Sequence, residues 1–134
     1  MQDRYLFRGT RIDNGEWIVG SLIVDKHQDI ETGEQIEIIG IYPSEYKDFS
    51  KRIYPSTICQ CTGLKDKNGN LIWENDIIEC KFGKAVVIWD KSEWRIKWLD
   101  DLVWRKDLHY WATDDGGKIK VIGNVFDSPD LLEV

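Results

Sequence analysis

The sequence predicts a mainly β protein, in which short antiparallel strands form a small barrel-like fold with at most short helical turns. About eight short segments alternate apolar and polar residues, and turns rich in glycine and asparagine separate them. No segment has an apolar periodicity long enough for a helix of about ten residues. The length of 134 residues suits one domain, predicted over residues 1–134, with two lobes at residues 1–58 and 59–134.

Strands in the first lobe are predicted where alternating residues stand between turn residues. Asn14 and Gly15 favour a type I′ hairpin turn, because both central positions of that turn need a positive φ. Ser44 is a candidate N-cap for one helical turn within residues 43–49, a segment too short for a longer helix. The predicted strands of this lobe are residues 5–9, 16–24 and 35–39, with a second turn at residues 32–34.

The second lobe has the stronger strand pattern. In residues 93–98 the alternation is nearly perfect, so the two tryptophans are expected on one face with Ile96 and the two basic residues on the other. Residues 102–111 fit either a helical turn or a broken strand. The other predicted strands are residues 59–64, 71–73, 77–82, 85–89 and 118–123, joined by turns at residues 65–70, 83–84, 90–92 and 114–117 and followed by a terminal turn at residues 127–132.

Charge restricts the classes of partner. The formal net charge is −6 and the sequence pI about 4.9, which argues against double-stranded nucleic acid as the main partner. The charge is spread evenly, because residues 1–58 hold 7 Lys or Arg and 10 Asp or Glu, and residues 59–134 hold 11 and 14. No electrostatically separate arm or tail is therefore expected.

The chain has no predicted targeting segment. It starts without a basic region followed by an apolar run, so we expect no secretory signal. Its longest apolar stretches, such as residues 85–89, are far shorter than the roughly 20 residues of a membrane span. Cys59, Cys61 and Cys80 are too few for a disulfide framework and odd in number. We therefore expect a cytoplasmic protein with free thiols and no membrane partner.

No pattern of catalytic or metal-binding residues stands out. Cys59 and Cys61 are spaced as C-x-C, and His27 and His109 are isolated, so no metal site is predicted. We expect no catalytic residues, no cofactor and no enzyme activity. Acidic pairs at strand corners usually accept hydrogen bonds from turns, which is how we interpret Glu74 with Asp76 and Asp100 with Asp101.

The seven tryptophans are the strongest functional signal, and six of them follow residue 70. We interpret them first as core or subunit-interface residues, because Trp supplies a large apolar area with one polar atom. The alternative is a platform that stacks unpaired bases beside basic side chains. The candidate interaction surface for either partner consists of Trp94, Trp98, Trp104, Arg95, Lys97 and Arg105.

Four ordered motifs are distributed from residue 7 to residue 132, at residues 7–20 (FRGTRIDNGEWIVG), 54–63 (YPSTICQCTG), 62–78 (TGLKDKNGNLIWENDII) and 122–132 (IGNVFDSPDLL). Together they resemble the YopX family, small proteins encoded mainly by phages and prophages of Gram-positive bacteria. Asn75 stands where that family usually has glycine. If that glycine has a positive φ, Asn75 is expected to adopt it more readily than most residues.

The resemblance implies an all-β fold of unassigned biochemical activity and provides no catalytic residues to transfer. We therefore expect a non-catalytic protein of phage or prophage origin that acts through protein–protein contacts in the bacterial cytoplasm. A homo-oligomer is one form of such contact. Single-stranded nucleic-acid binding through exposed tryptophans is the alternative function.

Overall fold

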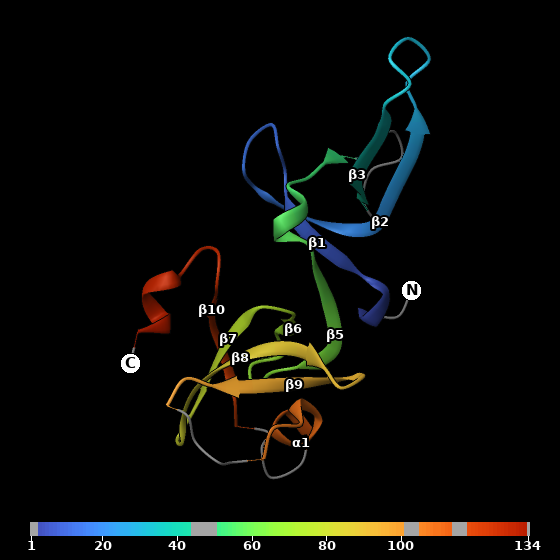
Figure 1. Ribbon diagram of the computed structural model, residues 1–134. Coiled ribbons are helices and arrows are strands. Elements are labelled where there is room, and N and C mark those ends of the chain that lie inside the picture. The colour runs from blue at the N-terminus through green and yellow to red at the C-terminus, as the bar shows by residue number, and fades with distance from the viewer. Residues whose placement is uncertain (1–2, 44–50, 101–104, 114–117, 134) are drawn as a thin grey trace. The chain divides into compact units, whose positions relative to one another are not determined.

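The computed structural model describes residues 3–43, 51–100, 105–113 and 118–133 (Figure 1). The chain forms two compact units, Met1–Gln60 and Cys61–Val134, each of which is described by itself. The described residues contain ten strands and one short α-helix, α1 (Leu108–Thr113). The prediction of a mainly β fold is confirmed. The strand pairings between described residues form open antiparallel sheets rather than a closed barrel.

The first unit is an antiparallel sheet with the order β4-β3-β2-β1, and the first residues of β5 pair with β1. A 3-10 turn at Asp3–Tyr5 delays the first strand beyond its predicted start, because the Leu6 N–H donates to the Asp3 carbonyl at 3.0 Å. The bounds are β1 (Phe7–Thr10), β2 (Trp17–Gln28), β3 (Gln35–Pro43), β4 (Lys51–Arg52) and β5 (Cys59–Lys65). The helical turn predicted within residues 43–49 lies largely outside the described residues.

The β1–β2 hairpin is present, but the predicted type I′ turn is wrong. Gly15 has a φ of 72°, whereas Asn14 does not have a positive φ. Asn14 instead accepts the Glu16 N–H on its side-chain oxygen at 2.9 Å. The backbone closes a wider loop, in which the Arg11 N–H donates to the Glu16 carbonyl at 2.9 Å. Asparagine thus stabilises this turn through its side chain rather than through a left-handed backbone.

Close backbone packing defines the core of the first unit. Gly9 on β1 lies against Ile53, and a Cβ at this glycine would stand 2.8 Å from the Ile53 Cδ1 atom. Ile53 is 1% exposed, and Ile41 of β3 is fully buried. A larger residue at position 9 would push against the buried Ile53 side chain, which accounts for the glycine there.

The second unit contains a sheet with the order β10-β7-β8-β9, and the rest of β5 pairs with β6. All of its described pairings are antiparallel. The sequence of residues 102–111 fitted either a helical turn or a strand. Among the described residues of this segment, Leu108–Trp111 form the start of α1, so the helical alternative is observed there. The bounds are β6 (Leu71–Trp73), β7 (Asp76–Cys80), β8 (Gly83–Asp90), β9 (Glu93–Trp98), β10 (Lys120–Asn124) and a final 3-10 turn (Pro129–Leu132).

Two turns of this unit depend on left-handed residues. Asn75 has a φ of 69°, as expected for a position that usually carries glycine, and its N–H donates to the Val87 carbonyl at 2.9 Å. Lys91 and Ser92 both have positive φ, at 52° and 61°, in the two-residue loop between β8 and β9. This is the arrangement of a type I′ turn, formed where the sequence has no Asn-Gly pair.

The core of the second unit lies between the sheet and α1. It combines branched aliphatic residues with two large indole rings, which pack edge to face with a centroid distance of 5.3 Å. Its buried members are Ile72, Ile78, Ala85, Val87, Ile96, Trp98, Leu108, Trp111 and Ile119. None of the helices in the described part of the chain has the length and apolar character that a membrane crossing requires.

Candidate functional site

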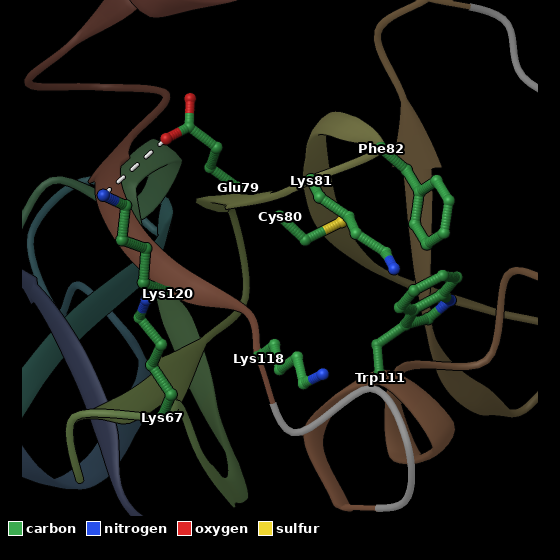
Figure 2. Close-up of a pocket in the computed structure, with 8 residues that line it drawn as sticks. All are labelled: Lys67, Glu79, Cys80, Lys81, Phe82, Trp111, Lys118 and Lys120. Atoms are coloured by element: carbon green, nitrogen blue, oxygen red, sulfur yellow. Dashed lines mark ion pairs between the residues drawn. The ribbon is translucent and has the colours of Figure 1, made fainter.

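A pocket of about 400 Å³ lies in the second unit, beside the β7–β8 turn, α1 and the start of β10 (Figure 2). Its lining combines four lysines with one carboxylate, one thiol and two aromatic rings. The lining residues are Lys67, Glu79, Cys80, Lys81, Phe82, Trp111, Lys118 and Lys120. Basic side chains therefore gather at one place on a chain that is acidic as a whole.

The lysines of this pocket come from three separate segments. Lys118 and Lys120 flank Ile119, which is 1% exposed, so the chain at this point directs both lysines away from the core. The Lys67 N–H donates to the Ile119 carbonyl at 3.0 Å, which fixes the β5–β6 loop beside them. Lys81 belongs to the tight turn between β7 and β8. Sequence analysis missed this cluster, because only the lysine alternation around Ile119 was visible in the sequence.

Asp66 fixes the loop that carries Lys67. Its carboxylate accepts the backbone N–H groups of Asn68, Asn70 and Val121, each at 2.9 Å. Burial opposes the ionisation of Asp66, but these donors together hold the pKa of Asp66 below its usual value. A charged Asp66 therefore ties the β5–β6 turn to β10 and so positions two walls of the pocket.

The aromatic side of the pocket is held rigidly. The Trp111 Nε1–H donates to the Arg105 carbonyl at 2.7 Å. The rings of Phe82 and Trp111 meet edge to face, with centroids 5.8 Å apart and an interplanar angle of 71°. The Lys81 ammonium nitrogen lies 5.0 Å from the centroid of the Phe82 ring. A ring face and a cation thus adjoin at this end of the pocket.

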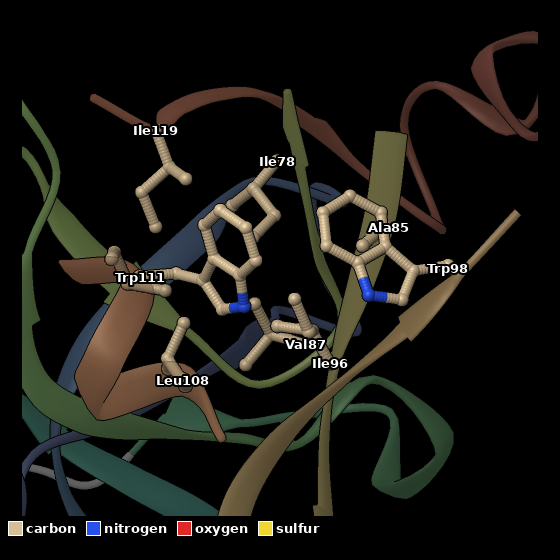
Figure 3. Close-up of a cluster of buried hydrophobic side chains, with 9 residues drawn as sticks. Ile78, Ala85, Val87, Ile96, Trp98, Leu108, Trp111 and Ile119 are labelled. Carbon is tan, nitrogen blue, oxygen red and sulfur yellow. The ribbon is translucent and has the colours of Figure 1, made fainter. Parts of the chain in front are cut away.

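The predicted interaction surface on β9 is divided between two faces of the strand. Trp98 is 6% exposed and packs in the core with Ile96 and Trp111 (Figure 3). Trp94 is half-buried and packs against the same core. Arg95 and Lys97 lie on the opposite face. The structure therefore does not bring the tryptophans and the basic residues of this strand together, and Trp98 offers no ring face for stacking.

The two remaining members of that surface follow β9. Trp104 lies outside the described residues. Arg105 is exposed, and its Nε atom donates to the Asp107 carboxylate at 2.7 Å. Burial works against the ionisation of Asp107, yet the hydrogen bond and charge of Arg105 hold the pKa of Asp107 below its usual value. Arg95 forms an ion pair with Glu93, so a carboxylate neutralises each of these arginines.

Cysteine and histidine residues form no metal site in the described part of the chain, where no group of three potential ligands occurs. Cys59 and Cys61 are fully buried, and Cys80 is half-buried at the pocket. His27 lies on β2 with its Nδ1 atom 3.8 Å from an Asp25 carboxylate oxygen. These side chains supply isolated contacts rather than a coordination sphere.

A two-stranded ribbon in the first unit is the second candidate site. We use the name distal ribbon for residues 24–28 of β2 and 35–39 of β3, which pair with each other from Val24 opposite Ile39 to Gln28 opposite Gln35. The β2 part lies beyond the pairing with β1, and β4 pairs with β3 only at Gly40 and Ile41. No described strand therefore pairs with the outer side of residues 35–38.

The hydrogen-bond pattern shows which backbone groups face this open edge. The Asp29 N–H donates to the Glu34 carbonyl at 2.8 Å and closes the ribbon tip. Because bonded pairs alternate along antiparallel strands, Ile36 and Ile38 bond to β2, whereas Gln35 and Glu37 direct their N–H and C=O groups outward. The Ile39 carbonyl agrees with this alternation, since it accepts the Ile53 N–H from outside at 3.2 Å.

Apolar side chains occur on both faces of the distal ribbon. Val24 is 48% exposed, and it shares one face with Ile39. Ile36 and Ile38 are half-buried on the other face. An isolated two-stranded ribbon buries little apolar surface of its own, so these residues have unused contact area.

Comparisons with known proteins agree with the observed fold. A family model described as YopX protein matches residues 6–133. No curated protein sequence matches the chain. Among solved structures, the crystal structure of protein EF1440 from Enterococcus faecalis is similar, with a TM-score of 0.52 and 24% sequence identity, over 95% of this chain and 96% of that chain. At this identity the similarity supports the fold and no further property.

Proposed function

The chain belongs to the YopX family, as its four motifs indicated, and from the distal ribbon we propose that it is a non-catalytic protein that binds an extended segment of a partner protein. In this proposal the partner strand adds to the open edge of β3 at residues 35–38. Such strand addition obtains affinity from main-chain hydrogen bonds and specificity from alternate side chains. We place this protein in the cytoplasm of a bacterial host and assign it a phage or prophage origin.

The outward backbone groups of Gln35 and Glu37 are the observation that carries the proposal. Exposed edge strands normally have a protective feature such as proline, a bulge, a lysine or a covering loop. Residues 35–38 contain no proline, and their pairing with β2 is regular. Their one charged side chain is Glu37, which disfavours an acidic partner strand and favours a basic one. Among the described residues nothing pairs with this edge, so it suits an additional strand.

The charge of the hairpin indicates the chemistry of the partner. Residues 25–37, which form the distal ribbon and its tip, contain five acidic side chains and one lysine, so this segment is locally acidic. Their acidic members are Asp25, Asp29, Glu31, Glu34 and Glu37. The partner segment is therefore extended, with alternating apolar and basic residues, because opposite charges across paired strands are favourable and like charges are not.

Fluorescence anisotropy with a labelled peptide of alternating lysine and valine tests this proposal. The matched control peptide alternates glutamate and valine. We expect the basic peptide to bind and the acidic one to bind at least about tenfold more weakly, since the hairpin repels the latter. Equal affinity for the two peptides, or no binding of the basic one, would contradict the proposal.

A pair of variants at Glu37 separates edge pairing from charge. Glu37→Thr removes the carboxylate and keeps the outward N–H, whereas Glu37→Pro removes both, and the bonds to β2 from Ile36 and Ile38 are kept in both variants. Both variants lose the Lys26 ion pair at 3.6 Å, which is exposed and contributes little. We expect Glu37→Pro to bind the basic peptide about tenfold more weakly than Glu37→Thr. Proline has no N–H to donate to the partner strand, and its ring obstructs pairing at this edge.

Light scattering after size exclusion tests whether a second copy of the chain occupies the open edge of β3. We expect a monomer that takes up the basic peptide. A dimer that the Glu37→Pro variant abolishes would place a second copy on this edge and overturn the assignment to a different protein. Circular dichroism on each variant checks that the sheet is intact.

A further inference from the structure

We infer that the lysine-rich pocket of the second unit binds a nucleotide, with the phosphate among the lysine ammonium groups and the base against the exposed part of Phe82, which Trp111 supports from behind. This site is independent of the distal ribbon, and it uses none of the residues of the predicted β9 surface. Free mononucleotides and the phosphodiesters of a single strand share this chemistry, so the experiment below separates the two sources.

Among the described residues, the pocket holds four lysines and one carboxylate. The Lys120 Nζ atom lies 3.8 Å from a Glu79 carboxylate oxygen, and these two lining residues form an ion pair. Lys67, Lys81 and Lys118 form no ion pair with a described carboxylate. Lysine ammonium groups that line one pocket repel one another, and a bound phosphate relieves that repulsion while accepting their hydrogen bonds.

The geometry places an apolar ring beside that charge. Phe82 is 37% exposed at the pocket, whereas Trp111 is 7% exposed and is fixed by its hydrogen bond to the Arg105 carbonyl. In Figure 2 the ammonium ends of Lys81 and Lys118 are directed toward the side where these two rings lie. A base resting on Phe82 would therefore have its phosphate within reach of both lysines.

The size of the pocket agrees with this ligand class. Its volume of about 400 Å³ falls within the range of small-molecule sites, and its walls come from the β5–β6 loop, the β7–β8 turn, α1 and β10. Inorganic phosphate would use the lysines without the aromatic wall. Recognition of both a ring and a phosphate explains why these residue types occur together.

Cys80 provides a local probe of occupancy. It lines the pocket and is half-buried, whereas Cys59 and Cys61 are fully buried, so Cys80 is the thiol expected to react first with iodoacetamide. Intact mass measures its rate of modification, and isothermal titration calorimetry measures affinity. The probes are AMP, adenosine, pyrophosphate and an eight-residue thymidine oligonucleotide.

We expect AMP to bind and to slow the modification of Cys80, and adenosine and pyrophosphate each to bind about tenfold more weakly, since each lacks one half of the recognised group. Tighter binding of the oligonucleotide than of AMP, with the same protection of Cys80, assigns the site to a nucleic-acid strand. Tighter binding of AMP assigns it to a free nucleotide.

The double variant Lys81→Ala and Lys118→Ala tests the location. Lys97→Ala, which removes an exposed lysine of β9 outside the pocket, is the control for the loss of a surface charge. We expect the double variant to bind AMP at least about tenfold more weakly and the control to be unchanged. Three results would overturn the inference: no heat and no protection with millimolar AMP, heat without protection of Cys80, or an equal loss of affinity in Lys97→Ala. Pyrophosphate binding equal to that of AMP would remove the base from the assignment and so also contradict it.

Discussion

Replacing Asp66 with alanine is expected to destabilise the second unit while its hydrophobic core stays intact. Asp66 is 7% exposed, and its carboxylate accepts three backbone N–H groups, each at 2.9 Å. Two of these donors, from Asn68 and Asn70, belong to exposed turn residues, and the third, from Val121, belongs to β10. Loss of the acceptor therefore affects a turn and the anchoring of a strand together.

The magnitude follows from what replaces each hydrogen bond. Water can solvate the N–H groups of the two exposed asparagines, so each loses only part of its hydrogen-bond energy. The Val121 N–H is half-buried and loses most of the contribution of a bond to a charged group. We expect Asp66→Ala to lower the free energy of unfolding by about 3 kcal/mol at neutral pH. Asp66→Asn keeps an acceptor oxygen without the charge, and roughly half that loss is expected.

Urea unfolding followed by tryptophan fluorescence measures this change, because six of the seven tryptophans lie in Cys61–Val134. The pH dependence gives an independent check. The folded-state pKa of Asp66 is lowered, so its contribution is fully present above the unfolded value of about 3.9 and is lost as the pH falls through the folded value. The stability difference between wild type and Asp66→Ala should therefore be constant from about pH 7 to about pH 5 and shrink below about pH 4.

Two results would refute this reasoning. A loss below about 1 kcal/mol at neutral pH would mean that the three donors find other partners at no cost. A difference that persists unchanged at about pH 3 would mean that the charge of Asp66 plays no part, and that the loss arises from packing instead.

Two further substitutions follow from the same coordinates. Trp111→Phe should lower the free energy of unfolding by about 1–3 kcal/mol more than Trp98→Phe, as measured by urea unfolding followed by circular dichroism. The reason is that the Trp111 Nε1–H donates to a carbonyl at 2.7 Å, whereas the buried Trp98 Nε1–H has no partner among the described residues. Equal losses would contradict this. Replacing Lys91 and Ser92 together by Asn-Gly should raise the unfolding free energy by about 1 kcal/mol, because both exposed residues now adopt positive φ, and an unchanged urea midpoint would count against a strained turn.

Local patterns predicted the strands well, because alternation and turn residues act over a few positions. The nearly perfect alternation of residues 93–98 gave β9 and its two faces correctly. The apolar face is the inner one, and Trp98 lies in the core, in line with the first interpretation of the tryptophans. Alternation did not show which segments cover that face, and Ile96 packs there among aliphatic residues of β7, β8 and α1.

The turns and the pocket show the same limit. Asn14-Gly15 does not form the type I′ turn expected of it, because the Asn14 side chain accepts a backbone hydrogen bond instead. The turn predicted at residues 90–92 is present, and its positive φ values at Lys91 and Ser92 match the strand twist rather than the residue preference. The four pocket lysines stand at positions 67, 81, 118 and 120, and sheet pairing between β7 and β10 brings them together. No spacing rule for a motif connects residues so far apart along the chain.

The pairing of β10 with β7 has a consequence for the order of folding. The β7–β8 and β8–β9 pairs are hairpins between neighbouring strands, whereas Lys120 pairs with Glu79 across a loop of about 40 residues. Closing such a loop is slower than forming either hairpin. During synthesis on a ribosome, β7, β8 and β9 would therefore pair first. The outer side of β7 would stay unpaired until β10 has been synthesised. The rate of folding of the second unit is expected to depend on this closure.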